Sequence, residues 1–161
     1  DKKRVTAPAV DPADLETLVE GNSGFAFALY RQLSQGDGNL FYSPPSISLA
    51  LAMAYAGAEG ETEQQMAQAL HYILSQERLH PAFNALDQEL AQRGEGAEGK
   101  DGEGFRLNVV NATWGQVDYE FLAAYLDVLA ENYGAGRRLL DFVGDPEGSR
   151  ATRRRRAASR T

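Results

Sequence analysis

The sequence contains no cysteine and only two histidines. Without cysteine the chain forms no disulfide, offers no thiolate to a metal ion and has no cysteine nucleophile, although this absence fixes no cellular compartment. His71 and His80 have neither the helical nor the hairpin spacing of a metal-binding pair, so we expect structural roles for both, at the surface or partly buried. We therefore expect neither a metal nor a cofactor.

Long apolar runs are also absent. No stretch approaches the roughly 18 to 20 apolar residues of a membrane span, and no apolar signal-peptide segment opens the chain. The chain begins at Asp1 rather than Met, so we expect that a preceding piece is missing. These features predict no membrane partner.

Basic residues are scarce over most of the chain. The formal net charge is −7, from 16 basic and 23 acidic side chains, but six of the basic residues fall in the last twelve positions, where there is no acid. Residues 1–149 therefore carry ten basic against 23 acidic groups, a balance of −13. Such a body repels nucleic acid and anionic membranes, because phosphate contacts need clustered lysine or arginine. We expect no nucleic-acid partner.

The 161 residues, of which 43% are apolar, suffice for one globular domain with a core. Residues 1–13 lack an apolar period and predict a mobile leader. From Leu15 to Leu33, apolar residues recur at helical spacing and predict a long first helix that ends near residues 36–38. A short β-type run follows at 39–42.

The next predicted helix starts at Ser43-Pro44, where Ser43 suits the N-cap and Pro44 the first helical position. From residue 47 to 58 it is almost entirely apolar, so we expect burial on nearly all sides. Thr62 and Gln65 have the spacing of a capping box and predict a third helix, to about Leu70.

The second half alternates further helices with strands. A helical stripe at residues 79–90 gives way to a glycine-rich loop at 94–104, and β-type alternation at 105–114 predicts a strand. We then expect a helix over 122–133, closed by Gly134, and a strand over 137–143. Asp145-Pro146 predicts a further helix start, but residues 151–161 have no large apolar side chain, so we expect that helix not to form.

Several short motifs allow a chemical interpretation that their context opposes. Residues 94–99 fit G-x-G-x-x-G, but they follow a helical stripe, and Glu95 and Glu98 would repel a pyrophosphate. Residues 111–113 form a glycosylation sequon inside a predicted strand, where we expect no glycan. No Ser-His-Asp set is apparent, so we expect no enzyme.

One set of motifs is far more specific. Residues 39–47 (NLFYSPPSI), 50–53 (ALAM) and 57–62 (GAEGET) closely resemble the signature of the serpins, the serine protease inhibitor family. Further matches follow in the family's order at 111–114 (NATW), 133–135 (YGA), 140–142 (LDF) and 145–150 (DPEGSR). The resemblance covers about residues 14–150 and suggests the N-terminal part of a serpin, of bacterial type.

The resemblance implies an α+β fold with helices A to E, strand 6 of sheet B, strands 2 and 1 of sheet A, and the start of helix F. It also implies suicide inhibition of a serine protease, in which a cleaved reactive loop inserts into sheet A. In serpins that loop lies near the C-terminus of the domain, so we expect it to be absent from this chain and the chain to be inactive alone. Family habit favours an extracellular or periplasmic location.

Three residues match the family's shutter region, through which sheet A opens. Ser43 and Ser46 match positions whose hydroxyls bond beneath the central strands of sheet A, and Asn39 matches a neighbouring position. The alternatives are a simple N-cap for Ser43 and local hydrogen bonding in a loop for Asn39.

The last eleven residues depart from the serpin pattern. Where the family continues helix F, Thr152 is followed by four arginines, and we expect a shifted reading frame or a truncation near Arg150. A genuine basic tail is the alternative. In that case the chain would be a non-inhibitory binding or remnant protein derived from a serpin.

Overall fold

A computed structural model describes residues 2–93, 112–135 and 138–158 of the chain. Its helices are α1 (Pro12–Leu33), α2 (Pro44–Tyr55), α3 (Gly60–Leu70), α4 (Gln76–Arg93), α5 (Ala123–Tyr133) and α6 (Pro146–Ala158). The strands are β1 (Gly115–Gln116) and β2 (Leu139–Leu140). The predicted glycine-rich loop at 94–104 lies outside the described residues, as does most of the predicted strand at 105–114.

Helix α1 confirms the first predicted helix. Asp11 caps it by accepting a hydrogen bond from the Ala13 amide, and Pro12 occupies the first helical position. Leu18 and Phe25 bury one face, and the helix ends at Leu33, shortly before the glycines at 36 and 38. Local signals at both ends therefore set the length of α1.

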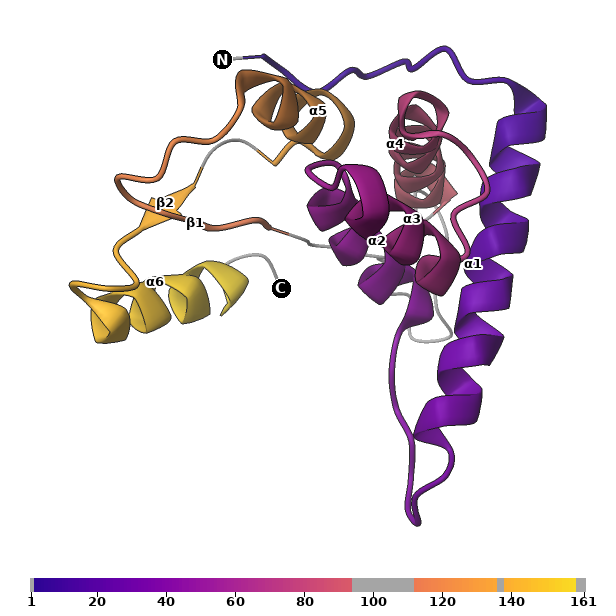
Figure 1. Cartoon of the computed structure of the whole chain (residues 1–161), viewed down its shortest axis with the longest axis horizontal. Helices are drawn as coiled ribbons and strands as arrows, with labels where there is room; N and C mark the ends of the chain where they lie inside the picture. Colours follow the sequence, from indigo (N-terminus) through magenta and orange to yellow (C-terminus); the bar gives the residue numbers. More distant parts are fainter. Residues whose placement is uncertain (1, 94–111, 136–137, 159–161) are drawn as a thin grey trace, which may run out of the picture.

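The main core forms where α1 packs against α2, α3 and α4 (Figure 1). Eleven buried side chains make up this core: Leu18, Phe25, Ala52, Tyr55, Ala58, Leu70, Tyr72, Leu74, Leu79, Ala82 and Phe83. A second, smaller cluster joins α2 to α5 through Met53 and Leu129. The core therefore lies at one side of the molecule, with α5 attached to it.

Helix α2 begins where the sequence predicts but is less buried than expected. Ala52, Met53 and Tyr55 are buried, whereas Ala50, Leu51 and Ala54 are exposed. The prediction of burial on nearly all sides is therefore wrong for this chain. Among the described residues, α1 and α3 pack against α2 and α5 contacts it at Met53, which leaves the other face of α2 exposed at Leu51 and Ala54.

Helix α3 starts earlier than its predicted capping box. Its N-cap is Glu59. Gln65 forms no capping bond, and its side-chain amide instead donates a hydrogen bond to the Glu61 carboxylate one turn earlier, at 2.9 Å. Thr62 is therefore a residue of the first turn rather than the N-cap. At the other end, His71 adopts a left-handed conformation with φ of 58° and closes the helix.

The two strands pair in parallel, with Gly115 opposite Leu139 and Gln116 opposite Leu140. Parallel strands need a crossover connection, and α5 provides it. Helix α5 ends at Gly134, whose φ of 59° suits glycine, as the sequence predicts. The predicted strand at 137–143 is confirmed in its centre, although the ladder is short.

The run at 39–42 is not a strand in the structure. Its residues adopt no regular secondary structure, and Phe41 is fully exposed. A strand needs a neighbour to satisfy its backbone groups, and within the described part of the chain none lies alongside this segment. The expected strand 6 of sheet B is therefore absent from the described structure.

Helix α6 forms where the sequence predicts that no helix continues. Asp145 caps it by accepting a hydrogen bond from the Gly148 amide at 2.9 Å, as Asp145-Pro146 indicates. Beyond residue 150, alanine and arginine sustain the helix because both have high intrinsic helix propensity. The prediction is therefore wrong, because a helix can extend without an apolar face to bury.

The leader is held in place rather than extended into solvent. Arg4 donates to the Asn84 amide oxygen and pairs with Asp87 on α4, at 2.8 and 2.6 Å. The Val5 amide donates to the Glu131 carbonyl of α5 at 2.9 Å. The leader thus has specific partners far along the sequence, which the sequence pattern did not predict.

No described helix is both long enough and apolar enough to cross a membrane.

Candidate functional site

The two shutter-type serines meet at the first turn of α2. The hydroxyl oxygens of Ser43 and Ser46 lie 2.9 Å apart, and both side chains are accessible to solvent in part or in full. Ser43 occupies the N-cap position, but its hydroxyl receives no backbone hydrogen bond. The simple capping role predicted as an alternative for Ser43 is therefore wrong.

The two prolines explain why the serines pair with one another. Pro44 and Pro45 have no backbone N–H, so the first two helical positions offer no amide hydrogen to the Ser43 hydroxyl. Ser46 is three residues further along the helix, where its side chain lies on the same face. The serine pair therefore needs only the SPPS sequence and a helix that starts at Pro44.

Asn39 is not brought into this pair. Its side chain is exposed on the irregular segment before α2, and within the described residues it forms no hydrogen bond. Within the described residues, no contact therefore supports either of the roles predicted for Asn39, the shutter role or local hydrogen bonding in a loop.

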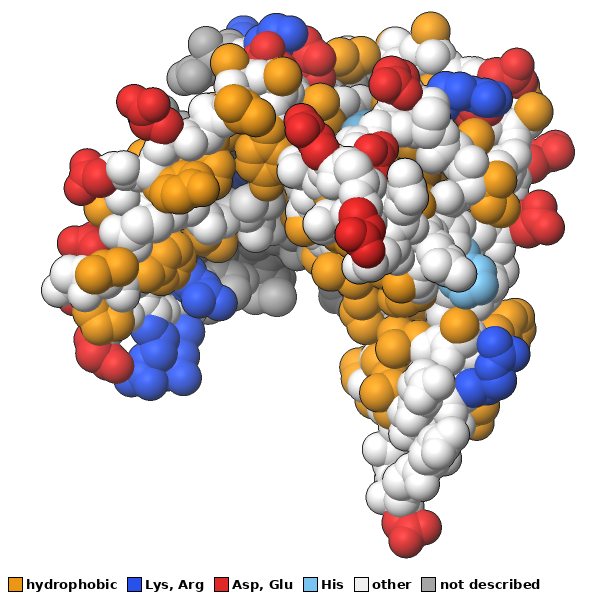
Figure 2. Space-filling view, in the orientation of Figure 1, with side chains coloured by type: hydrophobic (Ala, Val, Ile, Leu, Met, Phe, Trp, Pro, Cys, Tyr) orange, Lys and Arg blue, Asp and Glu red, His pale blue; other side chains and the backbone are white. Residues whose placement is uncertain are grey.

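Large apolar side chains are exposed on the second half of α1 and on the segment that leads from α1 to the serine pair. Phe27, Tyr30 and Leu33 on α1 and Leu40 and Phe41 after it form what we call the lower apolar surface. Figure 2 shows apolar side chains gathered where the end of α1 projects from the body. A surface of this kind normally marks a place where another segment or another chain packs.

A buried polar network lies behind the serine pair, on the inner side of α2. The Ser48 hydroxyl donates to the Asn22 amide oxygen at 2.6 Å, and the Tyr72 hydroxyl donates to the Ser48 carbonyl at 2.7 Å. Ser48 is fully buried, and burial raises the pKa of Tyr72 to about 12. The network fixes α2 against α1 and against the segment after α3.

Ser48 is a structural residue that was not predicted from the sequence. Its signal was present, since Ser48 is one of two interruptions in the apolar run at 47–58. A polar residue inside an otherwise apolar helix must find a partner when it is buried. That partner, Asn22, lies 26 residues earlier and cannot be deduced from local pattern.

A second polar cluster joins α4 to α5. His80 is 3% exposed and contacts the Tyr133 hydroxyl through Nδ1 at 2.6 Å and Gln76 through Nε2 at 3.2 Å. Burial lowers the pKa of His80 to about 4, although the nearby Glu77 carboxylate acts in the opposite sense. His71 is exposed, as expected, whereas His80 is more deeply buried than the partial burial expected from the sequence.

In the described ranges, no group of three or more histidine, aspartate or glutamate side chains could hold a metal ion. Several acidic side chains are instead bound to amides and arginines. In one such pair, buried Asp14 accepts two hydrogen bonds from the Arg78 guanidinium.

The chain matches the family model described as Serpin (serine protease inhibitor) over residues 20–157. Its relatives include the leukocyte elastase inhibitor of Equus caballus, 36% identical over 138 residues, and that of Xenopus laevis, 32% identical over 138 residues. Each alignment covers 84% of this chain and 34% of the relative. A serpin-like protein of Thermococcus kodakarensis is 35% identical over 129 residues, which cover 80% of this chain and 29% of that protein.

The chain thus spans about a third of the length of the curated relatives that it matches. The family model covers most of the chain and includes the serine pair, the buried network and both strands. We conclude that this chain belongs to the serpin family.

Proposed function

We propose that this chain supplies the N-terminal helices and first sheet A strands of a serpin that inhibits a serine protease. The observation that carries the proposal is the serine pair at the start of α2, together with the exposed side chains of the lower apolar surface. This arrangement suits a helix that lies under a sheet, because a covering sheet would bury the apolar side chains and receive the hydroxyls.

The inhibitory step would follow the serpin pattern. The protease attacks the reactive loop and forms an acyl-enzyme, and the cleaved loop then enters sheet A as an added strand. In this scheme β1 and β2 belong to the sheet that opens, while Ser43 and Ser46 lie beneath it. Their hydroxyls would hydrogen-bond to the sheet and contribute to the barrier that insertion must cross.

The names of the vertebrate relatives suggest the class of target. Those relatives are named leukocyte elastase inhibitors, so a protease of the elastase type is the natural first candidate. A serpin selects its target through the reactive loop, which we place outside these 161 residues. We therefore propose a serine protease as the partner and expect no inhibition by the isolated chain.

A direct test uses the 161-residue chain and a chimera. In the chimera, residues 20–150 replace the matching part of the Equus caballus leukocyte elastase inhibitor. After incubation with active leukocyte elastase, we expect an SDS-stable complex for the chimera and none for the isolated chain. Elastase with its catalytic serine blocked is the control, because no acyl bond can form.

Two results would contradict the proposal. A folded chimera that elastase cleaves without forming a stable complex would show that these residues do not support insertion. A stable complex formed by the isolated chain would show that inhibition needs no further sequence. A double variant, Ser43→Ala with Ser46→Ala, in the chimera should change the ratio of complex to cleaved product.

The alternative is a binding protein without inhibitory function that uses the serpin scaffold. The observation that favours it is α6, whose arginines at 153–155 are exposed and take no part in the buried network or the serine pair. The chimera experiment separates the two, because a scaffold that cannot support insertion yields only cleaved product.

A further inference from the structure

A cavity of about 660 Å³ opens between the leader, the turn from α2 to α3, α4 and α5. Four carboxylates line it, those of Glu59, Glu63, Glu77 and Glu131, together with apolar groups such as Val128, and no lysine or arginine does. We call this the acidic cavity. Apolar walls with carboxylates at the opening suit a guanidinium group, whose aliphatic stem packs while its charge is paired.

Three of the four carboxylates have polar partners, and one of them, Glu77, accepts hydrogen bonds from Ser75 and from its own backbone amide. Glu63 accepts a hydrogen bond from Gln76 at 2.9 Å, and Glu131 pairs with Lys2 at 2.8 Å. Glu59 and Glu77 are exposed, and neither pairs with a basic side chain in the part of the chain that the structure describes. The acidic cavity therefore retains two carboxylates whose negative charge no described basic side chain neutralises.

Helix α6 presents the opposite charge. Arg153, Arg154 and Arg155 are exposed, and within the described ranges none of them has an acidic partner. Arg150 pairs with Glu147 at 2.7 Å and lies on the same helix face as Arg153 and Arg154. Like charges at this spacing destabilise a helix, so an acidic partner would stabilise α6.

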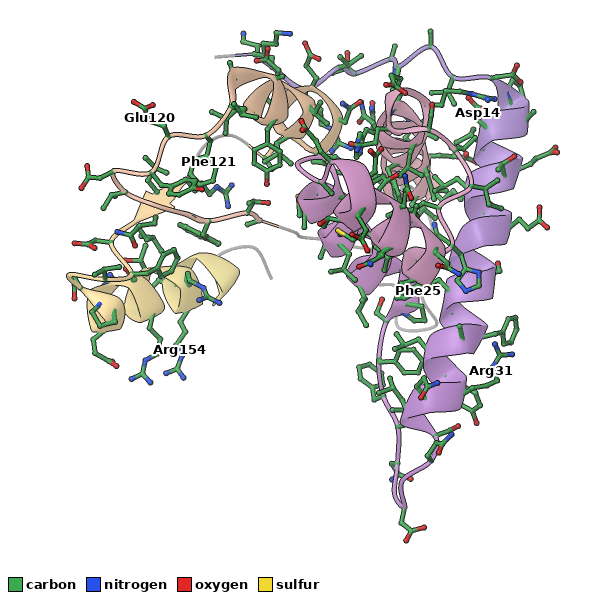
Figure 3. All side chains as sticks on the ribbon, viewed as in Figure 1. Asp14, Phe25, Arg31, Glu120, Phe121 and Arg154 are labelled. Atoms are coloured by element: carbon green, nitrogen blue, oxygen red, sulfur yellow. The ribbon has the colours of Figure 1, made fainter. Side chains whose placement is uncertain are left out.

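The arginines and the cavity do not meet within one molecule. The cavity lies between α3, α4 and α5, whereas α6 lies beyond the β1 and β2 pair (Figure 1). Arg154 points away from the rest of the chain (Figure 3). The geometry points to a contact in which the arginines of α6 enter the acidic cavity of a second copy of this chain.

Charge complementarity selects a second copy over a nucleic acid. Residues 1–149 carry a balance of −13, which repels phosphate but supplies the counter-charge that arginine needs. The contact joins two different surfaces, so it is head-to-tail, and repeated addition would give chains rather than a closed dimer.

Sedimentation velocity of the 161-residue chain tests the contact. Because the pairs are near the surface, we expect self-association at about 20 mM NaCl that is lost at about 300 mM. Aggregation through the lower apolar surface would behave differently, since salt does not dissolve apolar contacts. A chain that stays monomeric at low salt up to about 100 µM, or association that high salt leaves unchanged, would overturn the inference.

Charge reversal identifies the two surfaces. The triple variant Arg153→Glu, Arg154→Glu, Arg155→Glu should be monomeric at low salt, as should the double variant Glu59→Lys, Glu77→Lys. Mixing the two variants should restore association, because the reversed charges are again complementary. This restoration also shows that both variants are folded.

A matched control carries the same charge change elsewhere. Glu16 and Glu20 are exposed on α1, away from the acidic cavity, and Glu16→Lys with Glu20→Lys should leave association within about twofold of the unchanged chain. Loss of association in this control, or no restoration on mixing, would refute a specific contact. Binding of the monomer to single-stranded DNA through α6, with no self-association, would equally refute it.

Discussion

His80 Nδ1 and the Tyr133 hydroxyl lie 2.6 Å apart and join the first half of α4 to the end of α5. The tautomer of His80 follows from its other neighbour. Gln76 donates its amide hydrogens to the Ala58 carbonyl and to Glu63, so its oxygen faces His80 Nε2 as an acceptor. Nε2 therefore carries the proton, Nδ1 accepts from Tyr133, and the neutral ring satisfies both partners.

This arrangement predicts that acid weakens the fold through His80. Burial lowers its pKa from 6.5 to about 4, so between these values the unfolded chain binds a proton that the folded chain does not. Stability therefore rises with pH across this window, and at pH 4 the loss from this group is about 3 kcal/mol. Urea unfolding at pH 7.5 and at pH 4 measures it.

The variant His80→Gln is the control for that measurement, because Gln keeps polar atoms at the site but does not titrate. Tyr133, Gln76, Glu77 and the Tyr55 ring face His80, and of these only the Glu77 carboxylate changes charge in the acid range. The variant should lose less stability than the parent between the two pH values. Equal losses would contradict the prediction.

Elements with strong local signals could be predicted from the sequence. Helices α1, α4 and α5 each have a regular apolar stripe, and α1 and α5 also have an end signal, the glycines at 36 and 38 for one and Gly134 for the other. Helix α2 starts at the predicted residue for the same reason. Most failures concern burial and partners, which depend on distant segments, although the start of α3 and the extent of α6 are local features that were also wrongly predicted.

At the candidate site too, local features could be predicted from the sequence and distant partners could not. The family signature located Ser43 and Ser46, and the structure brings their hydroxyls together. The buried network was missed, because Asn22 and Ser48 are 26 positions apart and only the folded chain shows that they meet. The same reason explains the leader, since Arg4 and Asn84 are separated by 80 positions.

The Ser48 hydroxyl should be important for stability. In Ser48→Ala the Asn22 amide oxygen loses its donor in a buried environment, and we expect a loss of about 1 to 3 kcal/mol in the free energy of unfolding. Chemical denaturation at neutral pH measures it. The control is Ser46→Ala, which removes a solvent-accessible hydroxyl and should change stability by less than about 0.5 kcal/mol. Similar effects of the two substitutions would refute the assigned role of Ser48.

Arg4 should determine whether the leader stays attached. In Arg4→Ala the bonds to Asn84 and Asp87 are lost, so the Val5 amide should open more often from the Glu131 carbonyl. Hydrogen exchange at the Val5 amide measures this, and we expect at least about tenfold faster exchange. Lys3→Ala is the control, since Lys3 is exposed and forms no ion pair with the described residues. Unchanged exchange in Arg4→Ala would show that other contacts hold the leader.

Gly21 should resist substitution although it lies inside a helix. Alanine in a helix interior is normally more stable than glycine by about 0.5 to 1 kcal/mol. At this position, however, an added Cβ would overlap the backbone carbonyl of His71, which closes α3. Because a backbone group cannot rotate away, α1 and the end of α3 must separate, and we expect Gly21→Ala to lower the free energy of unfolding by about 1 to 3 kcal/mol. Gly36→Ala is the matched control, as an added Cβ there meets no atom within 4 Å, and it should leave stability unchanged or slightly raised. A stabilising effect of Gly21→Ala would show that the helix preference for alanine outweighs this close approach, and that α1 and α3 are less tightly packed than the structure indicates.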